Sequence, residues 1–264
     1  MKLGYDREDY LSCGLKLSRM LTFGDAISSL LIAGKSGSGK SLSLLWYIYQ
    51  LLAGQESRVF IADYKGGSEY APFEGSHAYA SGESAFQMIE DNYAFFTFAR
   101  EHRIRSPTHF TLVIEEWLGL LTYAETKSKK LRAELTAKIG EILAVGRGLN
   151  IGLILCVQRA DAALFSNGSR EQFQAVLSFG RASAEHFRML GFSAELEENP
   201  TSSYKAGQAL CLIDGQEAPF EIIVPFIKNH AEMTLATRML LDRQPVLAEL
   251  TRAHGEAGSP GQNR

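Results

Sequence analysis

Two patterns of apolar residues alternate along the chain. Short apolar runs are typical of buried β-strands, and longer segments with apolar residues every three or four positions are typical of helices. The expected strands are Ser28 to Ala33, Arg58 to Asp63, His109 to Glu115, Asn150 to Gln158, Ala175 to Phe179, Ala209 to Ile213 and Phe220 to Pro225. The expected helices are Lys40 to Ala53, Gly82 to Arg103, Lys129 to Val145 and Ala182 to Leu190. This order predicts an α/β fold with a mainly parallel central sheet flanked by helices.

The chain has 264 residues, of which 45% are hydrophobic, so it can bury one large core. Residues 21–245 carry the alternating pattern and are expected to form one domain, preceded by an N-terminal segment of residues 1–20. Beyond Val246 the apolar density falls, and Gly, Ser, Pro and Asn accumulate from Gly255 to Arg264. Residues 246–264 are therefore expected to form a flexible tail.

Charge and cysteine usage narrow the class of protein. A net charge of -3 and a pI near 6.1 exclude a generally basic surface, so any contact with nucleic acid must be confined to a patch or groove. Cys13, Cys156 and Cys211 are too widely spaced for a zinc site or a disulfide framework. No apolar stretch reaches the roughly 18 residues of a membrane span. We expect a cytoplasmic protein that a partner could recruit to a membrane.

One expected strand leads directly into a glycine-rich turn and a helix. The turn, Gly34 to Ser41, matches G-x-x-x-x-G-K-S, the P-loop pattern, which arises by chance in a chain of this length with a probability of about one per cent. Its N–H groups and the helix N-terminus would surround the phosphates of ATP. We favour this interpretation over a glycine-rich turn without a ligand. The expected nucleotide-binding residues are Gly34, Lys35, Ser36, Gly37, Ser38, Gly39, Lys40 and Ser41. Lys40 would bridge the β- and γ-phosphates, and Ser41 would ligate Mg²⁺.

A second expected strand ends in the carboxylates Glu115 and Glu116. Taken alone, these would be two solvated glutamates, but two strands after a P-loop they have the position of a Walker B segment. Neighbouring residues on a strand point to opposite sides, so we assign them different roles. Glu115 would hold the metal, and Glu116 would orient the attacking water.

Two further catalytic candidates flank the next strand. Gln158 follows its end, where an amide could sense the γ-phosphate. Arg147 precedes its start and would project from the edge of the subunit, which suits an arginine supplied in trans to a neighbour. Arg181 is a rival for that role, although a solvated helix start explains it equally well, and Arg188 is a weaker candidate.

The run from Gly146 to Arg159 closely resembles the FtsK/SpoIIIE and HerA class of hexameric DNA-translocating ATPases. Leu30 to Leu45, Ile61 to Gly67 and Gly207 to Leu210 resemble other segments of that class in the same order. The resemblance implies a RecA-like ring, expected to be a hexamer, that uses ATP and Mg²⁺ to move double-stranded DNA. One departure is Glu115 where the class usually has aspartate, which would slow hydrolysis if the metal shell is rearranged.

The resemblance also implies a setting. The chain has no long N-terminal membrane region and no room after Phe226 for a winged-helix module, so it is similar to compact members on plasmids, conjugative elements and phages. A relaxase, replication or secretion protein would be a further partner. Two alternatives stay open: a secretion or coupling ATPase that moves a protein, and a nucleotide-gated assembly factor with little turnover.

In such rings, basic side chains on short loops contact DNA phosphates without reading bases. One expected loop, Tyr123 to Arg132, contains Lys127, Lys129 and Lys130, for which a solvated helix start is an equal alternative. The other, Asp161 to Gln172, contains Asn167 and Arg170 and follows Gln158, so it could respond to the state of the nucleotide.

Overall fold

A computed structural model describes residues 1–24, 26–165, 168–192 and 200–258. In this part of the chain, one group of strands lies side by side and parallel: β3 (Leu30–Gly34), β4 (Ser57–Asp63), β5 (Tyr79–Ser81), β6 (His109–Glu115), β7 (Ile151–Val157) and β8 (Ala175–Phe179). The others continue the sheet in antiparallel fashion: β9 (Gln208–Ile213), β10 (Phe220–Ile223), β1 (Lys2–Asp6) and β2 (Ser18–Met20).

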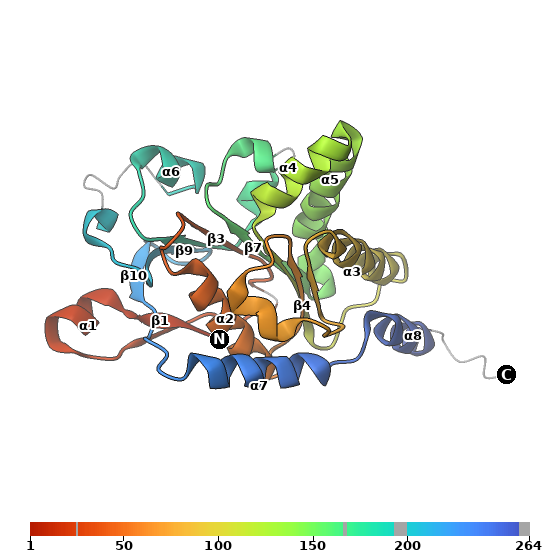
Figure 1. Cartoon of the computed structure of the whole chain (residues 1–264), viewed down its shortest axis with the longest axis horizontal. Helices are drawn as coiled ribbons and strands as arrows, with labels where there is room; N and C mark the ends of the chain where they lie inside the picture. The colour runs from red at the N-terminus through yellow and green to blue at the C-terminus, as the bar shows by residue number, and fades with distance from the viewer. Residues whose placement is uncertain (25, 166–167, 193–199, 259–264) are drawn as a thin grey trace.

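Together these strands form one sheet with the order β2-β1-β10-β9-β8-β3-β7-β6-β4-β5 (Figure 1). The predicted mainly parallel α/β arrangement is confirmed. Because β3 lies between β7 and β8, the turn after β3 is close to the ends of both neighbours. This is where the sequence places its phosphate-binding turn.

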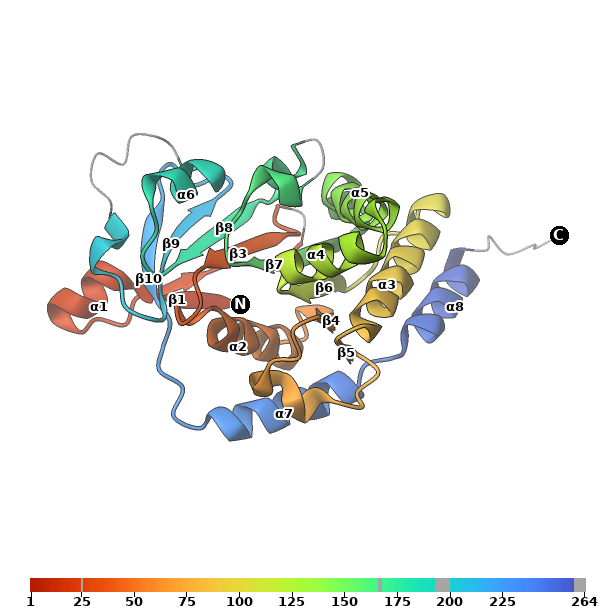
Figure 2. The same ribbon diagram turned by 45° about the horizontal axis from the view of Figure 1, so that its top comes forward.

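Helices cover both faces of the sheet (Figure 2). The helix α2 (Lys40–Ala53) lies on one face and packs against α7 (His230–Asp242). The other face carries α3 (Ser84–Glu101), α4 (Trp117–Lys127) and α5 (Lys129–Val145). The core between these layers includes the fully buried side chains of Tyr47, Phe60 and Trp117. Burial of such large aromatic surfaces is a major source of stability.

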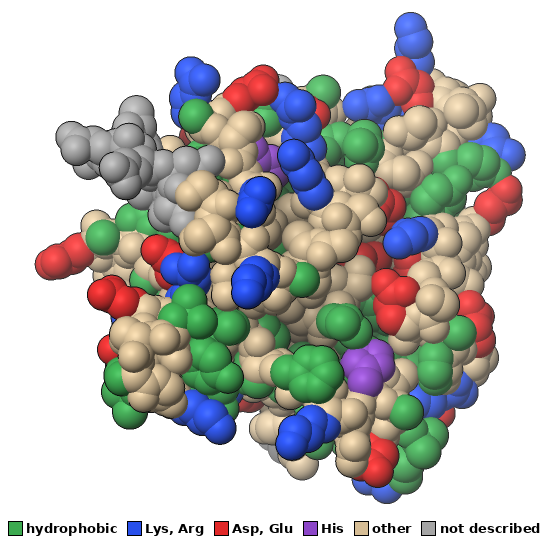
Figure 3. Space-filling view, turned by 60° about the vertical axis from the view of Figure 1, so that its left-hand side comes forward, with side chains coloured by type: hydrophobic (Ala, Val, Ile, Leu, Met, Phe, Trp, Pro, Cys, Tyr) green, Lys and Arg blue, Asp and Glu red, His purple; other side chains and the backbone are tan. Residues whose placement is uncertain are grey.

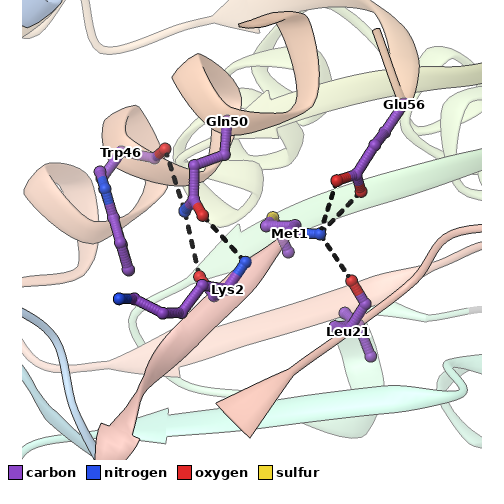
Figure 4. Close-up of polar contacts among 6 residues, drawn as sticks. All are labelled: Met1, Lys2, Leu21, Trp46, Gln50 and Glu56. Atoms are coloured by element: carbon purple, nitrogen blue, oxygen red, sulfur yellow. Dashed lines mark hydrogen bonds and ion pairs between the residues drawn. The ribbon is translucent and has the colours of Figure 1, made fainter. Parts of the chain in front are cut away.

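The N-terminal segment, which the sequence set apart, belongs to this sheet. The side-chain amide of Gln50 on α2 accepts a hydrogen bond from the Lys2 N–H at 2.9 Å and donates to the Lys2 carbonyl at 3.0 Å (Figure 4). The amino group of Met1 donates to Glu56 and to the Leu21 carbonyl. Residues 1–20 also form α1 (Arg7–Cys13), which has no buried residues.

The C-terminal part is more ordered than the sequence suggested. Leu247–Gly258 form α8, where a flexible tail was expected, and its residue Leu250 is buried. The reason is tertiary contact, since α8 packs against α3. Residues 259–264 lie outside the described part. A short helix, α6 (Ala184–Met189), completes the described α-helices. None of the described helices has the length and apolarity that crossing a membrane requires.

Candidate active site

The carboxyl ends of the parallel strands meet at one edge of the sheet, and most of the expected site residues lie there. The P-loop follows β3, Glu115 ends β6, Gln158 follows β7, and Gly180 follows β8. Ligands of open α/β sheets bind at this edge, outside the carboxyl ends of the strands. The topology therefore brings together residues that are more than a hundred positions apart in the sequence.

Glycine is required at two turns of the P-loop. Gly34 has φ 152°, and a Cβ atom there would lie 2.6 Å from the Phe179 carbonyl oxygen. Gly39 has φ 91°, and its Cβ would lie 2.6 Å from the Gly207 nitrogen. The backbone can approach β8 and β9 this closely only without side chains at these positions.

The start of α2 has the features of a phosphate site. Gly39 is its N-cap and provides no side-chain hydrogen bond, so the first N–H groups of the helix are left for a ligand. Lys40 is 8% exposed, and its ammonium group is 3.4 Å from the Lys35 carbonyl oxygen. The buried hydroxyl of Ser38 has no hydrogen-bond partner within the described residues. These groups fit an anionic ligand.

Ser41 and Glu115, the two residues expected to hold a metal ion, are in direct contact. The Ser41 hydroxyl donates to Glu115 Oε1 at 2.9 Å. Glu115 is 4% exposed, and its Oε2 atom has no hydrogen-bond partner in the described part of the chain. Burial raises the pKa of this carboxyl above its usual value. A hydroxyl and a buried carboxylate are oxygen ligands of the kind that Mg²⁺ prefers, and a cation would compensate the burial of the charge.

Glu116 is oriented differently from the way the sequence suggested. It does not continue β6 but has φ 59° and ψ 52° at the N-cap of α4. This left-handed conformation, rather than the alternation of side chains along a strand, separates it from Glu115. It is unfavourable for a residue other than glycine, and such strain is concentrated at functional sites. The side-chain amide of Gln158 donates to both carboxylate oxygens of Glu116 at 3.1 Å.

Asp63, at the end of β4, is a residue of this edge to which the sequence analysis gave no role. It is fully buried and accepts hydrogen bonds from the N–H groups of Gly66 and Gly67 and from the Tyr79 hydroxyl. Burial raises its pKa despite these donors. The signal was present in the sequence, since a carboxylate ends a buried strand just before two glycines. Asp63 holds the turn that borders the site.

Arg147 lies at the opposite edge of the sheet. It is exposed on a 3-10 turn, Gly146–Leu149, that precedes β7. The P-loop follows the other end of β3, a parallel neighbour of β7, so a strand length of about 20 Å separates Arg147 from its own site. Arg181, in contrast, follows Gly180 at the P-loop edge and is exposed, as is Arg188 on α6.

The first expected DNA-binding loop is a corner between two helices. Lys127 ends α4 and Lys129 begins α5, so the prediction of a loop from Tyr123 to Arg132 is wrong. The cause is Ser128, whose extended backbone ends one helix and whose side chain accepts a hydrogen bond from the Leu131 N–H at 3.0 Å to cap the next. Lys127, Lys129 and Lys130 are exposed on this corner.

The structure brings this corner close to the second expected loop. Arg132 on α5 donates to the Ala163 carbonyl at 3.1 Å. In the same loop, Arg170 lies on a 3-10 turn, Ser169–Gln172, and its guanidinium group is 3.5 Å from the Ala160 carbonyl oxygen. Asn167 lies outside the described residues. The two expected DNA-binding regions therefore form neighbouring parts of one surface.

No protein-family model matches this sequence, and no curated protein does. Solved structures nevertheless share the fold. The cytoplasmic domain of the Thermomonospora curvata type VII secretion ATPase EccC has a TM-score of 0.64 and 18% identity, covering 93% of this chain and 31% of that chain. The pCW3 conjugation coupling protein TcpA, in its monomer form with ATPγS, has a TM-score of 0.62 and 18% identity, covering 90% and 70%.

A smaller protein matches over almost its whole length. The genome packaging NTPase B204 from Sulfolobus turreted icosahedral virus 2, in complex with AMPPCP, has a TM-score of 0.52 and 16% identity, covering 77% of this chain and 99% of that chain. These likenesses agree with the predicted resemblance at the level of the fold, and they confirm the RecA-like α/β fold. At such low identities the likeness extends to the fold alone. This chain spans less than two thirds of the EccC chain.

Proposed function

We propose that this chain is the motor domain of a ring-shaped ATPase that moves double-stranded DNA. The observation that carries the proposal is the arrangement of Ser41, Glu115, Glu116 and Gln158 at the P-loop edge, with Arg147 at the opposite edge. In this proposal the first four residues supply the metal-binding and water-orienting groups of a hydrolysis site. In the proposed ring, Arg147, at the far end of the same sheet, completes the site of a neighbouring copy.

The residues of the P-loop edge have separate roles in this proposal. Lys40 and the N-terminus of α2 bind the phosphates, and Ser41 with Glu115 would hold Mg²⁺, which would neutralise charge on the phosphate oxygens. Glu116 orients the attacking water and accepts its proton. Gln158 fixes the position of Glu116, so a change of γ-phosphate occupancy would be passed from this pair into the loop that follows β7.

DNA is the proposed substrate because of the corner between α4 and α5. Lys129 and Lys130 lie in the first turn of α5, where positive charge opposes the helix dipole and lowers helix stability. Lys130 forms an exposed ion pair with Glu134 at 3.5 Å, but such pairs contribute little to stability, so we attribute the positive charge of this corner to an anionic ligand. Duplex DNA supplies phosphates at regular spacing. The names of TcpA, a conjugation coupling protein, and B204, a genome packaging NTPase, agree with this choice. A plasmid, conjugative element or phage is the proposed setting.

A protein substrate is the second candidate. EccC is a secretion ATPase, and a structure of its second and third ATPases in complex with a signal sequence peptide also shares this fold, with a TM-score of 0.60. The likeness to EccC favours a polypeptide substrate as strongly as the likeness to the coupling protein TcpA favours a DNA substrate. The basic corner between α4 and α5 is the feature of this chain for which we favour DNA over a polypeptide in this proposal.

Steady-state ATP hydrolysis by the full chain, with Mg²⁺, tests the proposal. Linear duplex DNA should raise kcat severalfold, and Glu116→Gln should remove both basal and stimulated turnover. Turnover that duplex DNA leaves unchanged but a secretion substrate raises would favour the second candidate. ATP binding without turnover under any condition would indicate a nucleotide-gated assembly factor. Particle images with a non-hydrolysable analogue would count the subunits of the ring, for which six are expected.

A further inference from the structure

Cavities of two kinds open on the molecule. The cavity beside the P-loop, which Tyr10, Gly39 and Phe226 help to line, is largely apolar and lies on the face that carries α1, where hydrophobic side chains gather (Figure 3). Two polar cavities, of about 410 Å³ and about 360 Å³, lie at the opposite edge of the sheet, at the starts of β4, β6 and β7. Gln55 and Thr108 line both of them. The two cavities are therefore parts of one groove, called here the amino-edge groove.

The amino-edge groove gathers positive charge. Arg105 lines one of its cavities, and Arg58 and Arg243 line the other. Glu56 also lines the groove, but the amino group of Met1 lies 2.7 Å from its Oε2 atom and neutralises its charge. No other acidic side chain is among the described residues of the lining. The groove is therefore suited to an anionic ligand.

Arg58 is the most informative of these arginines. Arg243 directly follows the C-terminus of α7, where a cation is favourable for the helix dipole whether or not a ligand binds. Arg58 has no such role, because it lies on the strand β4. It is partly buried, and within the described part of the chain its guanidinium group has no hydrogen bond and no ion pair. An anion bound in the groove would supply the missing partner.

Gln244 holds Arg243 beside Arg58. The strand β5 pairs with Ile61–Asp63 of β4 and leaves the first residues of β4 to another partner. That partner is the Gln244 side-chain amide, which accepts a hydrogen bond from the Val59 N–H at 2.7 Å and donates to the Val59 carbonyl at 2.9 Å. Arg243, the preceding residue, is thereby fixed at the cavity that Arg58 lines. Two guanidinium groups at one cavity suit a phosphate group, whose oxygens can accept hydrogen bonds from both.

The other end of the groove contains an unsatisfied hydrogen-bond acceptor. Asn150, which lines the groove just before β7, is 6% exposed. Its side-chain nitrogen donates to the Ser106 carbonyl at 2.9 Å, but its Oδ1 atom has no hydrogen-bond partner among the described residues. A hydroxyl group of a ligand could donate to this oxygen. Because only β6 lies between β7 and β4, the two ends of the groove are about 10 Å apart, and one small molecule can reach both.

We propose that the amino-edge groove binds a small phosphorylated molecule that also carries hydroxyl groups, such as a sugar phosphate. The phosphate group would lie between Arg58 and Arg243, and a hydroxyl group would donate to Asn150 Oδ1. Each cavity has a volume within the range of about 300–1,000 Å³ that is usual for small-molecule sites. The groove lies at the edge opposite the P-loop, so this site is separate from the proposed hydrolysis site and does not depend on it.

Calorimetric titration of the full chain with three probes tests the proposal: ribose 5-phosphate, glycerol 3-phosphate and inositol 1-phosphate. All titrations use the Lys40→Ala background, so that the P-loop does not bind the phosphate group. At least one probe should bind about tenfold more tightly than inorganic phosphate, because only the probes also offer a hydroxyl group to Asn150. Asn150→Gly, which permits the left-handed backbone at φ 60°, should remove this advantage and leave the binding of inorganic phosphate unchanged.

Arg58→Gln should weaken binding of the same probe by about tenfold or more, since it removes a charge-assisted contact. Arg58→Lys, which keeps the charge but not the two-pronged geometry, should cause a smaller loss. The matched control is Arg103→Gln, an exposed arginine in the loop before β6 that lines neither cavity, and it should leave binding unchanged. Vesicles that contain phosphatidylinositol 4-phosphate distinguish the source of the ligand. Competition by the vesicles would identify a lipid headgroup, and its absence a free metabolite.

Three results would overturn the inference. None of the probes binds, or Arg58→Gln binds the probe as tightly as the Arg103→Gln control does. In the third, Arg58→Gln weakens the binding of duplex DNA and leaves that of the probe intact, which would make the groove a DNA contact. Because the P-loop is disabled in all of these titrations, their outcome is independent of whether the chain hydrolyses ATP.

Discussion

The side-chain amide of Gln158 donates to both carboxylate oxygens of Glu116, at 3.1 Å each. Gln158 follows β7, and Glu116 is the N-cap of α4, so the contact joins two elements that diverge from the P-loop edge. Glu116 reaches this position through a left-handed backbone conformation at φ 59°. The pair is thus held from both sides, by backbone geometry and by an amide.

Glu116→Gln should preserve ATP binding and lower kcat by about a hundredfold or more, because the amide has the same shape but cannot accept a proton. Gln158→Ala should cause a smaller loss, since it frees the carboxylate without removing it. The measurements are the Kd for ATP and kcat with Mg²⁺. Glu101→Gln, an exposed residue at the end of α3, is the matched control. An unchanged kcat in Glu116→Gln would contradict the assignment.

Arg147→Ala and Lys40→Ala should each lose hydrolysis for different reasons. The first keeps its P-loop but offers no arginine to its neighbour, whereas the second offers the arginine but cannot bind phosphate. In a mixed ring, some interfaces pair an intact P-loop with an intact arginine. With equal amounts and random assembly, about one quarter of the activity should return on mixing. A mixture as inactive as its components would show that Arg147 does not act in trans.

The corner between α4 and α5 permits a charge reversal with little risk to folding. Lys129→Glu with Lys130→Glu should abolish stimulation by duplex DNA, because phosphate contacts become repulsive. Glutamates in the first turn of α5 interact favourably with the helix dipole, whereas Lys130→Glu replaces the ion pair with Glu134 by a repulsion of similar size. Thermal stability should therefore change little. The readouts are DNA-stimulated turnover and Tm, with Lys16→Glu, an exposed lysine near β2, as the control. Full stimulation in the double variant would exclude this corner as a DNA contact.

His109 should make stability depend on pH. Burial, reinforced by the nearby charge of Arg105, lowers the pKa of this histidine from 6.5 to about 4. Above pH 6.5 neither the folded nor the unfolded state is protonated there. Below pH 6.5 His109 becomes protonated in the unfolded chain, whereas in the folded state it stays neutral down to about pH 4. The free energy of unfolding should therefore fall as the pH is lowered, by about 2 kcal/mol between pH 7 and pH 5 from this residue.

Urea unfolding of the chain and of His109→Gln, at pH 7 and at pH 5, checks this prediction. The variant should be less stable at pH 7, since it disturbs a buried contact between His109 and Ser57, but its stability should depend less on pH. Equal pH dependence in the two proteins would show that His109 titrates normally.

Much of the site could be predicted because its residues lie in short, contiguous sequence patterns. The strand, glycine-rich turn and helix around Lys40 are contiguous in sequence, and Glu115 ends a strand that is apolar throughout, so both could be located without a structure. The strands β1, β2 and β5 could not. They are short and partly exposed, and they are stabilised by pairing with distant strands rather than by a pattern of their own.

Other features depend on conformation or on distant contacts. The left-handed backbone of Glu116 has no sequence signal, since most non-glycine residues avoid it. Ser128 was hidden inside a polar stretch that predicted a loop, although its capping of α5 follows a known preference. The cavity beside the P-loop joins Tyr10, Gly39 and Phe226, which only the folded chain brings together.

Displacement of a third strand from duplex DNA tests the proposed function most directly. A motor that moves along the duplex should release a triplex-forming oligonucleotide placed in its path, with ATP but not with a non-hydrolysable analogue, and not in the Glu116→Gln variant. Hydrolysis that duplex DNA stimulates without any release of the oligonucleotide would contradict translocation along double-stranded DNA.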